Sequence, residues 1–519
     1  MGNVAEGGRR LHLVGAVAGS LWLVEPALAA ISPGAPVTAS PFSVDAANRQ
    51  LAKLPAGDPW EQRPDGSTLA WGESHLLHAL VNLYEATGEV RYLEEAARRG
   101  DRLLSHRDDR RGVVDGSGQS RPAWSMADKY VVAAATLVDE AGRPALQVRS
   151  VPTSHNNFTE IAVVADSTPG RFDLHVTNEH FRRSEEFTGL TAAAGGPRFV
   201  EASVNARTYV RGTKAGKYSD ESRLIRVAVV AGGGAPRPQR VRLTPIPLAY
   251  TGYLGVIYHP MLRLAECVRA DARAAALADA AARFVQAAEE SYADADRRVW
   301  RDGPGDGEGY YLTCERGESF PYDNIGQPFN FLGRHTATLL ALHRLTGEVR
   351  YRERAARMAR LFQRRLRHDS DRDLYVWNYW YEPVTTTGWT AADGPSLNLP
   401  QMAPVATVED VSHGVLDIVL VSSAHRAGMV FNDRDLQRFC RTLLQRVLTP
   451  ERNGIHLRVD GTGGVAPDYL HALGGWLELA RYDPAVYHEI RRTAEAAKVT
   501  DLGVVSALLK WERVLAGGR

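Results

Sequence analysis

The sequence predicts a mainly α fold, an (α/α)6 toroid of helical hairpins with an inserted β-rich domain. The string Thr-Gly-Glu-Val-Arg-Tyr occurs at residues 87–92 and again, letter for letter, at 346–351. Each copy follows an apolar run and precedes an Arg-rich amphipathic run, so the Thr-Gly pair is expected to end one helix in a left-handed C-cap. A repeated helical hairpin therefore organises most of the chain.

Five helical hairpins are predicted from apolar residues that recur at helical spacing. They are residues 69–86 with 90–106, 251–270 with 272–291, 327–345 with 349–366, 409–427 with 433–447, and 469–480 with 485–497. Two more helices, 44–54 and 501–515, have no partner along the chain. Pairing these two would complete six hairpins and close a ring, whereas an open solenoid is the alternative.

Between residues 129 and 242 the hydrophobic period changes from helical to strand-like. The β-rich runs are 130–138, 145–151, 160–165, 171–178 and 224–230, and turn residues separate them at 139–144 and 167–170. We therefore expect a β-rich domain at 129–242, with the helical toroid contributed by residues 44–128 and 243–519.

The composition and net charge argue against several classes of protein. The 519 residues are 44% hydrophobic and 24% charged, with a net charge of +1. Such near-neutrality argues against a nucleic-acid partner, which would be held by clustered cationic side chains. The three cysteines, Cys267, Cys314 and Cys440, are scattered and offer neither a disulfide framework nor metal-ligand spacing. No motif for a metal or cofactor is found.

Residues 1–30 are predicted to form an export signal. Arg9 and Arg10 precede an apolar run at 11–24, and a small-residue cleavage site lies near Ala29. The paired arginines are compatible with the twin-arginine route, although the residues after them match that signal only in part. A short membrane anchor is the alternative, but the run is shorter than the roughly 20 residues that span a bilayer. We expect a periplasmic or extracellular protein with no membrane span after signal removal.

Polar residues gather in the opening turns of the first helix of each hairpin, which is otherwise poor in charge. In a ring, these inner helices run parallel, so their opening turns meet at one rim. The residues are Trp71, Glu73 and His75; Tyr253, Tyr258 and His259; Gln327, Asn330, Arg334 and His335; Glu409, Asp410 and His413; and Asp468, Tyr469 and His471. This rim is the predicted functional site.

The densest group is Glu409, Asp410 and His413. Spacings of four and three residues place a carboxylate beside the imidazole on one helical face. Such a carboxylate orients the ring and raises its basicity for proton abstraction. The competing interpretation is purely structural, because acids in a first helical turn also cap the helix and interact with its dipole.

Two further groups are candidates for sugar contacts. Trp71 and His75 flank Glu73, which is a candidate acid/base group or hydroxyl ligand, or a first-turn acid that stabilises its own helix. Alternating aromatics follow at Trp377, Tyr379 and Tyr381. One face of such a strand offers flat rings to a sugar, and the alternative is a strand packed on the rim.

The hairpin spacing, the run at 71–74 and the run at 409–414 resemble the six-hairpin, α/α-toroid superfamily of carbohydrate-active proteins. Its members include glycoside hydrolases, polysaccharide lyases and the C-terminal domain of glucuronyl C5-epimerases, so the resemblance implies a polysaccharide or oligosaccharide substrate. The segments 170–176, 186–190, 197–201 and 204–207 resemble part of contractile-tail sheath proteins, which implies a similar β module and no shared role.

Three functions remain open from the sequence. A uronate lyase or C5-epimerase would use His413, Tyr258 or Tyr379 as base, Asn330 and Arg334 to hold the carboxylate, and His335 as an assisting group. A glycoside hydrolase would use two carboxyl groups, Glu73 with Asp410 or Glu409. A non-catalytic secreted protein would use the ring as a scaffold that binds glycans or assembles with a partner.

Overall fold

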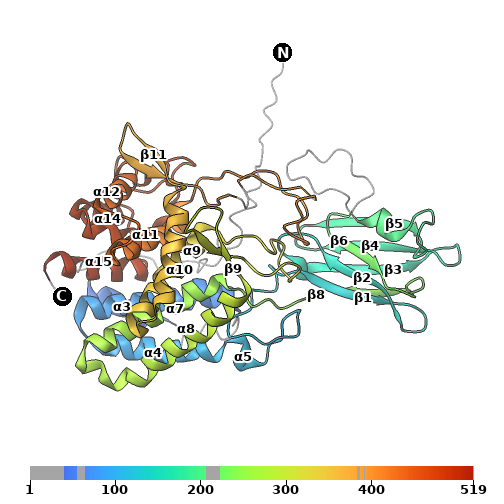
Figure 1. Cartoon of the computed structure of the whole chain (residues 1–519), viewed down its shortest axis with the longest axis horizontal. Helices are drawn as coiled ribbons and strands as arrows, with labels where there is room; N and C mark the ends of the chain where they lie inside the picture. Colours follow the sequence, from blue (N-terminus) through green and yellow to red (C-terminus); the bar gives the residue numbers. More distant parts are fainter. Residues whose placement is uncertain (1–39, 55–64, 206–221, 383–385, 391, 518–519) are drawn as a thin grey trace, which may run out of the picture. The chain divides into compact units, whose positions relative to one another are not determined.

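The computed structural model describes residues 40–54, 65–205, 222–382, 386–390 and 392–517 (Figure 1). The predicted export signal at 1–30 lies outside these residues. No helix in the described part of the chain is long and apolar enough to cross a membrane.

The fold is mainly α, as the sequence predicts. The helical elements before the strands are α1 (Val44–Leu51), α2 (Gly66–Thr68), η1 (Leu69–Glu73), α3 (Ser74–Thr87), α4 (Arg91–Ser105) and α5 (Asp108–Arg111). Those after the strands are α7 (Gly252–Ala270), η3 (Ala272–Leu277), α8 (Ala278–Arg298), α9 (Phe329–Thr346), α10 (Val349–Gln363), α11 (Val411–Arg426), α12 (Asp433–Thr442), η4 (Leu443–Val447), η5 (Pro467–Ala472), α13 (Leu473–Trp476), η6 (Leu477–Arg481), α14 (Pro484–Ala496) and α15 (Leu502–Leu515).

The first helices of the hairpins contact one another in a closed cycle. Following the chain, α3 packs against α7, α7 against α9, α9 against α11, α11 against α13, and α13 against α15. The last helix, α15, then packs against α3 and against α1 (Figure 1). We call these six segments the inner helices. The second helix of each hairpin packs on its own first helix, as α4 does on α3 and α10 on α9.

The two copies of the repeated string adopt the same structure. Gly88 and Gly347 end α3 and α9 in the left-handed region, with φ of 76° and 79°. Thr87 and Thr346 each donate a 2.8 Å hydrogen bond from the hydroxyl to the carbonyl four residues earlier. The predicted Thr-Gly turn is therefore confirmed in both copies, and it lies at the ends of the inner helices opposite the predicted site.

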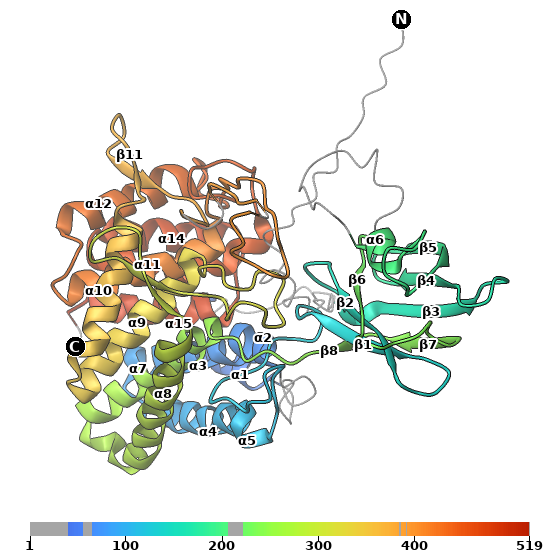
Figure 2. The ribbon, with the colours of Figure 1, turned by 45° about the vertical axis from the view of Figure 1, so that its right-hand side comes forward.

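The β-rich region contains two four-stranded sheets and the short helix α6 (Val200–Val204), which packs on β5 and β6 (Figure 2). The strands are β1 (Ala133–Val138), β2 (Pro144–Ser150), β3 (Thr159–Ala165), β4 (Phe172–Asn178), β5 (Arg183–Leu190), β6 (Ile225–Val229), β7 (Gln239–Arg242) and β8 (Thr244–Pro245). The sheet orders are β6-β2-β1-β8 and β5-β4-β3-β7, and every neighbouring pair is antiparallel.

The five predicted strand runs correspond to β1, β2, β3, β4 and β6, which supply most of the apolar side chains buried between the sheets. The strands β5, β7 and β8 were not predicted from the sequence. β5 carries mostly exposed polar residues, so it lacks the alternation by which a half-buried strand is detected. β8 pairs Pro245 with Ala133, so the strands extend slightly past the predicted boundary at residue 242.

Short strand pairs also follow two of the outer helices. After α8, β9 (Trp300–Asp302) pairs with β10 (Gly309–Tyr311). After α10, β11 (Arg367–Asp369) pairs with β12 (Leu374–Val376). The chain then passes from β12 through the aromatic run to the start of α11, which carries the densest group of candidate residues.

Candidate active site

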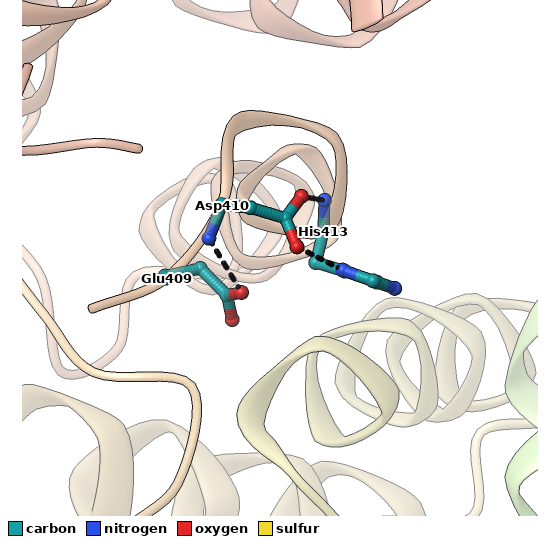
Figure 3. A group of neighbouring side chains, drawn as sticks. All are labelled: Glu409, Asp410 and His413. Atoms are coloured by element: carbon teal, nitrogen blue, oxygen red, sulfur yellow. Dashed lines mark hydrogen bonds and ion pairs between the residues drawn. The ribbon is translucent and has the colours of Figure 1, made fainter. Parts of the chain in front are cut away.

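Asp410 and His413 form a hydrogen-bonded pair at the start of α11 (Figure 3). Asp410 is the N-cap residue, and its Oδ1 accepts hydrogen bonds from the backbone N–H groups of Ser412 (2.9 Å) and His413 (3.0 Å). Its Oδ2 accepts from Nδ1 of His413 at 2.5 Å. The capping and catalytic interpretations of Asp410 are thus compatible, because each uses a different carboxylate oxygen.

The backbone holds Asp410 from two sides. The N–H of Glu409 donates to the carbonyl of Trp377, and the N–H of Val411 donates to the carbonyl of Leu457, both at 3.0 Å. The N–H of Val459 donates to the carbonyl of Glu409, also at 3.0 Å. The start of α11 is therefore fixed between two neighbouring segments, so the Asp410–His413 pair is held in place before a substrate binds.

The pair fixes the tautomer of His413. Because an ionised carboxylate only accepts hydrogen bonds, Nδ1 of His413 carries the proton and Nε2 of the neutral ring presents a lone pair. Burial alone would raise the pKa of Asp410, but the charge of His413 and the hydrogen bonds from His413 and Ser412 outweigh burial and lower the pKa to about 2. Among the described residues, none hydrogen-bonds to Nε2, which points away from Asp410 (Figure 3).

Aromatic rings surround the imidazole of His413. The ring of Tyr379 lies edge-on to it with centroids 5.4 Å apart, and the indole of Trp71 lies edge-on at 6.4 Å. Trp71 also contacts Phe331 at 5.8 Å and His75 at 6.1 Å. The structure therefore brings together predicted residues from α3, α11 and the aromatic run. Phe331 was not predicted, although its place beside Asn330 in the first turn of α9 was the available signal.

Arg334 and three histidines form a cluster that continues from this group along the inner helices. Arg334 on α9 donates from Nη1 to Nδ1 of His259 on α7 at 3.0 Å. Burial, and next the charge of Arg334, lower the pKa values of His75, His78 and His259, that of His75 to about 3. The ring of His78 on α3 lies 5.1 Å from that of His259. All three imidazoles are therefore neutral at physiological pH.

Glu409 is part of a second carboxyl pair that the sequence did not reveal. Its partner is Asp417 on α11, and both side chains are fully buried. Oδ2 of Asp417 accepts a 2.8 Å hydrogen bond from Nε1 of Trp377, and Oε1 of Glu409 accepts a 3.0 Å bond from the N–H of Asp410. Burial, and next the neighbouring carboxylates, raise the pKa of Glu409, and burial likewise raises that of Asp417.

Three predicted residues are engaged in buried contacts between helices. Glu73 forms a 2.8 Å ion pair with Arg99 on α4. The hydroxyl of Tyr258 lies 2.8 Å from that of Ser291 on α8, and it donates to the carbonyl of Ala287 at 3.0 Å. His335 lies between two further hydrogen-bond partners, 2.8 Å from the Tyr292 hydroxyl and 3.0 Å from the Gln327 amide oxygen, and burial lowers its pKa to about 3.

The remaining aromatics are buried. Trp377 has no exposed surface and packs against Phe439, with centroids 5.4 Å apart, so its role in the structure is to pack the core and hold Asp417. Tyr381 packs on Phe329 at 4.6 Å, and its buried hydroxyl has no hydrogen-bond partner among the described residues. Of the three alternating aromatics, Tyr379 is the one whose ring contacts His413.

Glu409, Asp410 and His413 each offer an oxygen or nitrogen atom within 4.8 Å of the others, a spacing that a metal ion would tolerate. However, Oδ1 and Oδ2 of Asp410 both accept hydrogen bonds, and Nδ1 of His413 donates one of them.

No family model matches the chain, and no curated protein matches it. Several solved structures align with it at low similarity. A GH76 α-mannanase of Bacteroides thetaiotaomicron aligns over 51% of this chain and 69% of its own, with 11% identity and a TM-score of 0.34. A sugar epimerase from a ruminal bacterium aligns over 54% and 76% (8% identity, TM-score 0.33), and a D-mannose isomerase over 53% and 75% (12%, 0.31).

Proposed function

We propose that the protein is a carbohydrate-active enzyme that removes a proton from a carbon of a sugar unit, with His413 as the base. The observation that carries the proposal is the orientation of His413. Asp410 holds Nδ1, and Nε2 is directed away from the carboxylate in a setting of aromatic rings, of which Trp71 and Tyr379 contact the imidazole. A fixed, oriented imidazole beside aromatic surfaces suits proton abstraction from a bound sugar.

Proton abstraction is favoured over glycoside hydrolysis by the state of the carboxyl groups. A hydrolase needs one carboxylic acid and one carboxylate on either side of the bond to be cleaved. Here Glu73 is paired with Arg99, Glu409 is fully buried beside Asp417, and Asp410 is bonded to His413. A uronate lyase and a C5-epimerase both use proton abstraction, and both remain within the proposal.

The architecture and location that we propose are those expected from the sequence. The closed cycle of contacts among the inner helices supports an (α/α)6 toroid with the strands of 133–245 as an insert. Export by the signal at 1–30 would bring the enzyme to extracellular or periplasmic polysaccharides.

The test is product analysis with purified protein and a panel of uronic-acid and neutral polysaccharides. A lyase produces the absorbance of unsaturated uronates, and an epimerase incorporates solvent deuterium at C5 without chain cleavage. New reducing ends with neither signal would indicate the hydrolase. Binding with no product at all would indicate the non-catalytic scaffold.

The matched control uses a second histidine of α11, His425, which is bonded to Asp433 at the start of α12. The proposal requires that His413→Asn abolish deuterium exchange or product formation while the circular dichroism spectrum is unchanged. His425→Asn, at the other end of α11, should retain full activity. Full activity of the His413→Asn variant would refute the assignment of the base.

A further inference from the structure

Arg334 is a buried arginine whose charge has no counter-ion in the described part of the chain. Its exposed fraction is 7%. Its one hydrogen bond to a described residue runs from Nη1 to the neutral His259, and its buried Nε has no partner. Arginines of comparable burial in this protein are paired, for example Arg107, which bonds to Asp109 and Glu290.

The unpaired atoms lie on one edge of the guanidinium. Nε–H and one N–H of Nη2 point in the same direction, because the guanidinium is planar and Nη1 lies on the side of Cδ. Neither Nε nor Nη2 bonds to a described residue. This edge is the fork that binds the two oxygens of a carboxylate or a phosphate side by side.

The surroundings of Arg334 compensate its charge only in part. Glu478 raises the pKa of Arg334 without forming an ion pair with it, and the Glu478 carboxylate is itself paired with Arg426 and Lys510. The imidazoles of His75, His78 and His259 are neutral, because burial and the charge of Arg334 lower their pKa values. Arg263 is a second cation nearby, and it is already paired with Glu85 at 2.8 Å. Burial, and next Arg263, lower the pKa of Arg334 to about 10, so it stays protonated at neutral pH.

An uncompensated buried charge destabilises a fold, and the position is therefore one where an anionic ligand would gain the most. Asn330, one helical turn before Arg334, has a buried amide Nδ2 that makes no well-formed hydrogen bond in the described structure, although its side chain interacts with the Tyr379 hydroxyl. Phe331, next to it, contacts Trp71, which lies between His75 and His413. Unpaired donors on α9 thus adjoin the aromatic surface that contacts the proposed base.

We propose that the Nε–Nη2 edge of Arg334, with the Asn330 amide as a second donor, binds one anionic group of the substrate. This inference rests on the proposed function and names its substrate class as an acidic sugar, bearing a carboxylate or a phosphate. The anion would hold the sugar against Trp71, with His413 reaching the ring. If the anion is a uronate carboxylate, its pairing with Arg334 also acidifies the C–H on the neighbouring carbon.

The experiment measures thermal unfolding of the full chain with sodium glucuronate, inorganic phosphate or glucose as probe. We expect the Tm to rise with glucuronate and not with glucose. A response to glucuronate alone identifies a carboxylate site, and a response to phosphate as well identifies a general oxyanion site. Equal responses to glucose and glucuronate, or no response to either anion, would overturn the proposal.

Two substitutions test the residue itself. Arg334→Met removes the charge, and Arg334→Lys keeps the charge but removes the fork. Both should weaken glucuronate binding about tenfold or more, since a bidentate, charge-assisted contact is lost. Without ligand, Arg334→Met should unfold at a higher temperature than the parent, because an unpaired buried cation is gone. An undiminished glucuronate response in either variant would refute the site.

Two controls separate this proposal from the proposed function. Arg263→Met removes a partly buried arginine that is paired, so it should lower the ligand-free Tm and leave the glucuronate response in place. His413→Asn should lose turnover and keep the glucuronate response. If His413→Asn keeps its turnover, the catalytic assignment fails while the anion site stands. If turnover depends on His413 and glucuronate binding does not depend on Arg334, the anion site fails alone.

Discussion

Each end of helix α11 has a histidine bonded to an aspartate: His413 to the N-cap residue Asp410, and His425 to Asp433 at the start of α12. At the start of the helix, His413 is 8% exposed in its side chain and bonds through Nδ1 to Asp410, itself 20% exposed. At the end, His425 bonds through Nε2 to Asp433, which is 91% exposed. A hydrogen-bonded carboxylate and imidazole are therefore insufficient to mark a site. Burial and a backbone-fixed carboxylate distinguish the first pair, and so do two aromatic rings at His413 where His425 contacts one, that of Tyr482.

The largest expected difference between the pairs is in turnover. Asp410→Asn places an amide where Nδ1 of His413 now donates, which favours the wrong tautomer and leaves Nε2 protonated. We expect kcat to fall by about 10²- to 10⁴-fold, the usual contribution of a positioned general base. Asp433→Asn should leave kcat unchanged. Equal losses in the two variants, measured on the substrate identified by product analysis, would remove the distinction.

The second difference is in acid stability. The folded pKa of Asp410 is about 2, below its ordinary 3.8. A depressed carboxyl pKa stabilises the fold above the unfolded pKa, and that stability is lost as pH falls from about 4 to about 2. The shift corresponds to about 2 kcal/mol. Urea unfolding from pH 5 to pH 2 should therefore show a shallower pH dependence for Asp410→Asn than for the parent. Asp433→Asn should follow the parent.

The third difference concerns the ring that each histidine contacts. Trp71→Ala removes the indole beside His413, and we expect KM to rise roughly tenfold, since an aromatic contact contributes about 1 kcal/mol beyond its buried area. Tyr482→Phe keeps the ring beside His425 and should leave KM unchanged. Steady-state kinetics of the two variants measure this, and a normal KM in Trp71→Ala would exclude the indole from substrate binding.

The smallest effect is expected at Glu409, whose carboxyl pKa is raised by burial and by the neighbouring carboxylates. A raised carboxyl pKa stabilises the fold at low pH, and that stability is lost as pH rises from the ordinary value of about 4.5 through the folded pKa. Glu409→Gln replaces the titrating carboxyl with a neutral amide. The Tm of this variant should therefore fall less than that of the parent between pH 4.5 and pH 8. Parallel curves of Tm against pH for the two proteins would show that folding does not raise the pKa of Glu409.

The sequence predicted the helical hairpins well because their apolar periodicity and Thr-Gly turns are local signals. The Asp410–His413 pair was likewise predictable, since its spacing of three residues lies within one helical turn. The role of Asp417 was not predictable, because it depends on a hydrogen bond from Trp377, which lies in a different segment of the chain.

The sequence also could not predict the direction in which a side chain of the first helical turn points. Glu73 lies in η1, a five-residue π-helical turn, whereas the prediction assumed regular α-helical spacing there. The structure pairs its carboxylate with Arg99 on α4, while Trp71 two residues earlier reaches His413. Sequence spacing therefore identified the correct segment, but it did not show that Trp71, and not Glu73, contacts His413.

The contact between α15 and α3 has a consequence for how the protein folds. α3 follows the first turns that carry Trp71, and α15 ends at Leu515, so the two helices that close the cycle come from opposite ends of the described chain. Contacts at such sequence separation form late, because a long loop must close before they add stability. During synthesis, the inner face of α3 therefore stays without its neighbour until nearly the whole sequence has left the ribosome. A chain shortened before residue 502 would leave the apolar side of α3 exposed and prone to aggregation.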